Sequence, residues 1–120
     1  MRWMTVRSIQ NYSKTPEGAL RTSIRHHRQI LNATLEELSK GLLNEKVSCS
    51  HIYCGLCFYH DRYRDNCQTC LLSDINVLCC WEWWTLAPVL EIFRDNPTKT
   101  NHTKVKRAER KLIKRMESLL

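Results

Sequence analysis

Glycine and proline are scarce in this 120-residue chain, with three of each, and long apolar segments are missing. Few glycines and prolines mean few tight turns, which disfavours a sheet-rich fold and favours long helices. The most apolar stretch, residues 77–92, is interrupted by Glu82, Pro88 and Glu91. A membrane-spanning helix needs about 20 predominantly apolar residues, so we expect no membrane partner.

Acidic residues are fewer than basic ones: 12 Asp and Glu against 19 Lys and Arg give a net charge of +7. This excess favours attraction to nucleic acid or to an acidic protein surface, although it also serves solubility alone. The first residues lack the apolar core of a secretory signal peptide, so we expect a cytoplasmic protein. In a reducing cytosol, cysteines more often bind metal than form disulfides.

The motifs of several common enzyme classes are missing. The chain has no H-E-x-x-H, P-loop, G-x-G-x-x-G or G-x-S-x-G sequence. His51 and His60 are not followed two positions later by Glu, so the zinc-deaminase signature is absent as well. We therefore predict that the protein is not an enzyme, has no catalytic residues and takes no small-molecule substrate. A metal-dependent or cysteine-dependent enzyme is the third-ranked alternative.

All seven cysteines lie between positions 49 and 80, and four of them form two C-x-x-C pairs separated by nine residues. Each pair can supply two thiolates from one tight turn, and the connecting loop can bring the turns together around one tetrahedral ion. We predict a structural Zn²⁺ site held by this set. The predicted ligands are Cys54, Cys57, Cys67 and Cys70.

Neighbouring residues are alternative ligands, and enough of them are present to support a second ion. These alternatives are Cys49, His60, Cys79 and Cys80. An iron–sulfur cluster is the minority interpretation, because the spacing resembles no ferredoxin pattern. A disulfide scaffold is also less favoured, because an odd number of cysteines leaves one thiol over.

One helix is predicted over residues 16–40. Thr15 suits the N-cap, Pro16 the first helical position and Glu17 the positive end of the helix dipole. Apolar positions then recur at alternating steps of three and four, which predicts an amphipathic helix. The stripe consists of Leu20, Ile24, His27, Leu31, Leu35, Leu38 and Leu42. We expect His27 in the core because it lies on this stripe, and His26 on the surface.

The remaining segments complete a single domain over residues 1–120. We expect a loose arm over 1–14, a zinc-binding segment over 46–80, a short helix over 85–94 and a basic helix over 101–119. The last helix has its own apolar stripe, complementary in length to that of the first. The predicted fold is mainly α, with two long amphipathic helices packed together, a central zinc-knuckle segment and a short third helix.

Two surfaces are candidates for binding. The last helix carries cations that can follow a phosphate backbone, although a solvated helix face has the same composition. The predicted nucleic-acid contacts are Lys104, Arg107, Arg110, Lys111 and Lys114. Clustered tryptophans follow the cysteines, and tryptophan is enriched in protein-binding hot spots. The predicted protein contacts are Trp81, Trp83 and Trp84, of which one or two can instead serve core packing.

The order of these elements resembles a diffuse group of small cysteine-rich accessory proteins of tailed bacteriophages, mostly of unassigned function. The similarity lies in a helix of the type found at residues 19–27, two C-x-x-C pairs, a further cysteine beside a tryptophan, and the Glu-Ser-Leu-Leu end at residues 117–120. Leu71 replaces the proline usual after the second pair, and the doubled Cys79-Cys80 leaves the further cysteine ambiguous.

The resemblance implies a protein that acts in the host cytoplasm by binding host machinery. We therefore expect a zinc-stabilised interaction protein that engages, and as an anti-defence or host-takeover factor inhibits, a host protein or protein–nucleic-acid complex. Direct DNA or RNA binding through the basic helix is the second candidate function.

Overall fold

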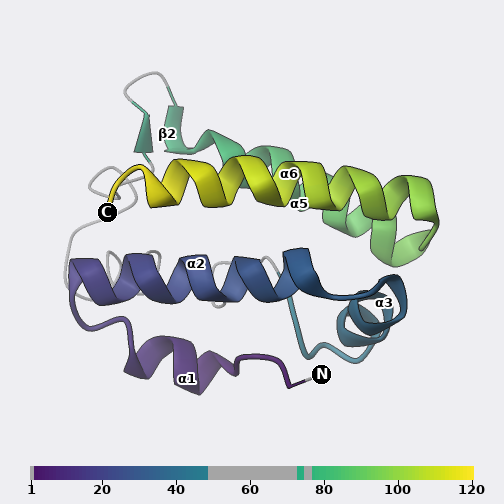
Figure 1. The fold of residues 1–120 in the computed structure, drawn as a ribbon, viewed down its shortest axis with the longest axis horizontal. Helices are drawn as coiled ribbons and strands as arrows, with labels where there is room; N and C mark the ends of the chain where they lie inside the picture. The colour runs from purple at the N-terminus through teal and green to yellow at the C-terminus, as the bar shows by residue number, and fades with distance from the viewer. Residues whose placement is uncertain (1, 49–72, 75–76) are drawn as a thin grey trace.

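A computed structural model of the chain describes residues 2–48, 73–74 and 77–120, with the backbone alone over 73–74 and 77–84. It is mainly helical, as predicted (Figure 1). The helices are α1 (Val6–Asn11), α2 (Pro16–Asn32), α3 (Leu35–Leu43), α5 (Trp81–Asp95) and α6 (Lys99–Glu117). Two short strands, β1 (Ser73–Asp74) and β2 (Val77–Cys80), pair antiparallel just before α5.

The N-terminal segment, predicted as a loose arm, contains α1. The Thr5 side chain caps this helix by accepting a hydrogen bond from the backbone N–H of Ser8 at 3.0 Å. Ile9 is fully buried. The Gln29 side chain of α2 accepts a hydrogen bond from the Met4 N–H and donates one to the Arg2 carbonyl. These contacts attach the arm to α2.

Residues 16–40, predicted as one helix, form two. Ala33 has an extended backbone, and Thr34 then starts α3 with a capping box. In this motif the Glu37 N–H donates to the Thr34 hydroxyl at 3.1 Å, and the Thr34 N–H donates to the Glu37 carboxylate at 2.9 Å. The stripe residues on the two sides of the break contact different buried clusters. Leu20, Ile24 and Leu31 belong to or pack against one, and Leu35, Leu38 and Leu42 belong to or pack against the other.

Helices α5 and α6 also differ in extent from their predicted ranges. α5 begins at Trp81 and keeps Pro88 inside it, whereas the sequence predicts a start near residue 85. α6 begins at Lys99, where the Thr98 side chain accepts a hydrogen bond from the Asn101 N–H at 3.1 Å. The helix therefore starts two residues before the predicted position, directly after its N-cap.

The core lies between α2, α5 and α6. α6 lies beside α2 and in front of α5 in Figure 1, and it runs antiparallel to α2. One buried cluster joins the first half of α2 to the second half of α6 and contains Ala19, Leu20, Ile24, Leu86, Ala108, Leu112, Ile113 and Met116. A second cluster joins the other ends of these helices to α3 and α5 and contains Ile30, Ala33, Leu38, Val47, Leu90, Phe93 and Val105.

Candidate functional site

The exposed face of α6 is the predicted site that the structure describes best. The helix buries one side against α2 and α5, including Val105, Leu112 and Met116. All five predicted nucleic-acid contacts lie on the opposite, exposed side. They are Lys104, Arg107, Arg110, Lys111 and Lys114.

This face carries little negative charge. Of the two carboxylates on α6, Glu109 is fully buried and Glu117 forms an ion pair with Arg28 of α2 at 3.1 Å. Within the described part of the chain, none of the five cations takes part in an ion pair. The helix therefore presents a continuous row of positive charge to solvent.

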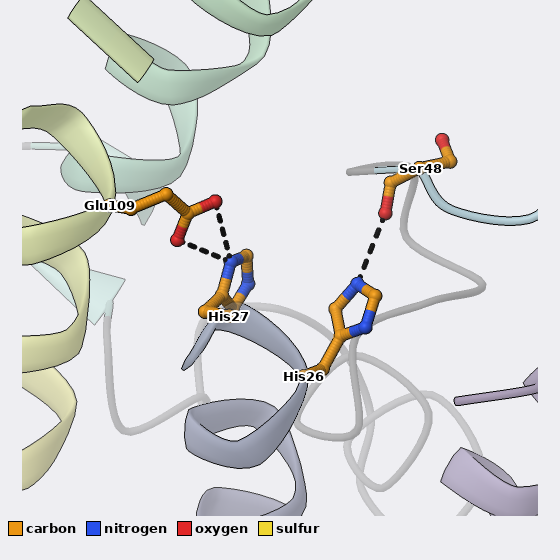
Figure 2. A network of polar contacts seen from close by, with 4 residues as sticks. All are labelled: His26, His27, Ser48 and Glu109. Atoms are coloured by element: carbon orange, nitrogen blue, oxygen red, sulfur yellow. Dashed lines mark hydrogen bonds and ion pairs between the residues drawn. The ribbon is translucent and has the colours of Figure 1, made fainter. Parts of the chain in front are cut away.

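A buried polar contact joins the other side of α6 to α2 (Figure 2). The His27 ring nitrogen Nδ1 lies 2.9 Å from Oε2 and 3.1 Å from Oε1 of Glu109. The side chains are 1% and 0% exposed. Because an ionised carboxylate only accepts hydrogen bonds, the contact places a proton on Nδ1. His27 therefore lies in the core with a hydrogen-bond partner, as predicted from its place on the apolar stripe.

The exposed position predicted for His26 is wrong, because this side chain is 0% exposed. Its Nε2 lies 3.2 Å from the carbonyl oxygen of Ser48, and a carbonyl accepts only, so Nε2 carries the proton (Figure 2). Burial, and then the neighbouring His27, lower the pKa of His26 from 6.5 to about 3. His26 is therefore neutral at physiological pH.

The burial of Glu109, which is 0% exposed, was not predicted from the sequence. The available signal is its spacing, four residues after Val105 and three before Leu112, which places it at the edge of the apolar stripe. Identifying His27 as its partner requires knowing that α2 packs against α6, because the two residues are 82 positions apart in the chain.

The predicted metal ligands lie outside the residues whose side chains are described. They are Cys54, Cys57, Cys67 and Cys70, with Cys49, His60, Cys79 and Cys80 as alternatives. Over residues 2–48 and 85–120, no group of three or more His, Cys, Asp or Glu side chains is placed to hold a metal ion.

The predicted protein contacts, Trp81, Trp83 and Trp84, occupy the first turn of α5, and their side chains also lie outside the described set. The backbone nevertheless places this turn directly after β2 and on a helix that packs against α6.

Comparisons of the chain with protein-family models, with curated proteins and with solved structures gave no match. Among the helices that the structure describes, none combines the length and apolar character needed to cross a membrane.

The contact between His27 and Glu109 predicts strong coupling between these residues. Glu109→Leu leaves a buried imidazole N–H without an acceptor, so we expect the free energy of unfolding to fall by roughly 3 kcal/mol. The double variant His27→Leu/Glu109→Leu replaces the pair by apolar groups and should be more stable than Glu109→Leu alone. Urea unfolding gives these values, and Arg110→Ala is the exposed control. Additive losses in the double variant would contradict the coupling.

The low pKa of His26 predicts a stability that depends on pH. Between its ordinary pKa of 6.5 and the folded value of about 3, His26 takes up a proton in the unfolded chain but not in the folded one. The free energy of unfolding should therefore fall as the pH falls through this window, by up to about 1.4 kcal/mol per pH unit. Urea unfolding at several pH values checks this. A variant His26→Gln with the same pH slope would show that His26 is not responsible.

Proposed function

We propose that this chain is a non-catalytic interaction protein that binds a nucleic acid, alone or within a host protein–nucleic-acid complex, through the exposed face of α6. The observation that supports the proposal is the row of cations from Lys104 to Lys114, all exposed and without ion-pair partners among the described residues. On a helix face that only contacts solvent, positive and negative side chains more often alternate.

The length of this row suits a polyanion. Lys114 follows Lys104 by ten positions, which corresponds to about 15 Å along a helix axis. One strand of duplex DNA carries a phosphate about every 3.4 Å, so the row spans several phosphates. Contacts of this kind add affinity by counterion release, without reading the sequence directly.

Zinc is proposed as a structural stabiliser. Cys54, Cys57, Cys67 and Cys70 are the proposed ligands because two C-x-x-C pairs supply a closed thiolate set. Such an ion holds chain segments together and takes no part in a reaction. The segment it would stabilise continues through β2 into α5.

The tryptophans at the start of α5 are proposed to contact the protein component of the target. Trp81, Trp83 and Trp84 combine large apolar area with a hydrogen-bond donor, which suits an interface anchor. The similarity to phage accessory proteins suggests a bacterial target in the host cytoplasm, with inhibition of that target as the outcome.

Neutralising four of the five cations on the basic face should weaken binding to DNA. We expect Arg107→Gln/Arg110→Gln/Lys111→Gln/Lys114→Gln to weaken binding strongly and to reduce the slope of log K against log salt by about 3 to 4. Fluorescence anisotropy with a short mixed-sequence duplex measures both quantities. The control removes the same charge from exposed positions elsewhere, with Arg7→Gln/Lys14→Gln/Lys40→Gln/Lys46→Gln. Equal losses in the two variants would indicate a net-charge effect and contradict a specific face.

Zinc removal should unfold the cysteine-containing segment. We expect the purified protein to contain about one zinc ion per chain, and Cys54→Ser/Cys67→Ser to contain much less. Native mass spectrometry measures the content, and thiol titration after chelation distinguishes thiolate ligands from disulfides. A metal-free protein with paired cysteines would contradict the zinc proposal and leave the α6 proposal standing.

A further inference from the structure

Helix α2 carries a second row of cations beside the basic face of α6. Arg21, Arg25 and Arg28 are spaced by four and three residues, so they share one side of α2, and all three are exposed. The buried side of this helix faces α6 through Leu20 and Ile24. The two rows can form one binding surface only if they lie on the same side of the α2–α6 pair.

The antiparallel packing of α2 and α6 places residues of both rows on the same side of the pair. His27 and Glu109 meet in the interior, and Arg28 and Arg110 are the residues that directly follow them. One residue turns a side chain by about 100° around its helix. Seen from one end of the helix pair, the chain runs away from the viewer in one helix and towards the viewer in the other. The step from His27 to Arg28 is therefore clockwise when the step from Glu109 to Arg110 is anticlockwise. Since His27 and Glu109 point at each other, both arginines lie on the same side of the helix pair, next to the buried contact.

An observed contact agrees with this geometry. Arg28 crosses the seam between the helices and pairs with Glu117 at 3.1 Å, with about half of each side chain exposed. Arg110 lies seven residues before Glu117, which is about two turns, so it occupies the same side of α6. The seam therefore opens onto a surface that carries the α2 row and Arg110, with Lys114 and Arg107 about 40° and 60° further round α6.

Two carboxylates partly neutralise the α2 row. Glu17 pairs with Arg21 at 2.9 Å, and Glu117 pairs with Arg28. Arg25, between them, takes part in no ion pair within the described residues. It is therefore the cation of α2 that is available to a ligand without first breaking a contact.

The chemistry of this surface selects one class of partner. Within α2 and α6, which are described throughout, no large apolar side chain is among the exposed hydrophobic residues. A protein interface has an apolar or aromatic centre, and a single-strand site has aromatic rings on which bases stack. This surface offers an excess of cations over carboxylates, spread over two helices and without an apolar or aromatic centre, which suits the phosphates of a duplex.

We propose that a nucleic-acid duplex binds across the seam between α2 and α6, with Arg25 as the phosphate contact on α2 and Glu117 as a residue that weakens binding by holding Arg28. The inference rests on the proposed function and extends it. It adds a second helix to the site, names the duplex as the ligand and assigns an opposing role to one carboxylate.

Single surface substitutions test the proposal with opposite expected signs. Arg25→Gln should weaken binding to a short mixed-sequence DNA duplex roughly fivefold and lower the magnitude of the salt slope by about 0.9. Glu117→Gln should release Arg28, tighten binding by a similar factor and raise the slope magnitude by a similar amount. Exposed positions on other helices serve as controls, with Arg7→Gln on α1 for the cation and Glu36→Gln on α3 for the carboxylate. Circular dichroism verifies that each variant is folded.

The outcomes separate this inference from the proposed function. Opposite shifts for Arg25→Gln and Glu117→Gln, both larger than the controls, support the two-helix surface. If both variants match their controls while the fourfold α6 variant still loses binding, the seam inference fails and the α6 proposal holds. If the unmodified protein binds neither the duplex nor the single strand at low salt, both fail. Tighter binding to the single strand than to the duplex would overturn the duplex assignment.

Discussion

The buried contact between His27 and Glu109 is the constraint on which the arrangement of α2 and α6 depends. A carboxylate with 0% exposure is stable in a protein interior only with a well-placed donor, and the imidazole Nδ1 supplies it from the neighbouring helix. An apolar stripe tolerates small rotations or shifts along the helix, whereas this contact does not. It therefore fixes which residues of the two helices lie side by side, and with them the surface formed by Arg28 and Arg110.

The charged residues of α6 thus divide into two roles. Glu109, on the inner side, fixes the position of the helix, while the cations on the outer side remain available to a ligand. The two roles occupy different sides of one helix, so substitutions can address them separately. Because the proposed surface belongs to helices packed on a common core, a duplex would meet charges that are already in position, which lowers the entropy cost of binding.

Much of the helical framework is predictable from local sequence, because its signals are local. Thr15 and Pro16 mark the start of α2, and the spacing of cations in α6 places them on one exposed side. The break before α3 also has a local signal in the Thr34 capping box. The apolar stripe runs across this position without interruption and therefore predicted one helix. The burial of His26 and its contact with Ser48 depend on how distant segments pack, which periodicity within one helix does not contain.

The Ser48 contact has a consequence for the segment that carries the cysteines. Its carbonyl is bonded to His26 just before residue 49, and at the other side β2 continues directly into α5. The chain on both sides of residues 49–72 is therefore attached to the helical core. Ligands on a segment with anchored ends lose less conformational entropy when they close around an ion than ligands on a free peptide do. Zinc affinity, as proposed, would then be thermodynamically linked to helix packing, so that loosening α2 from α6 weakens metal binding without any change to a cysteine.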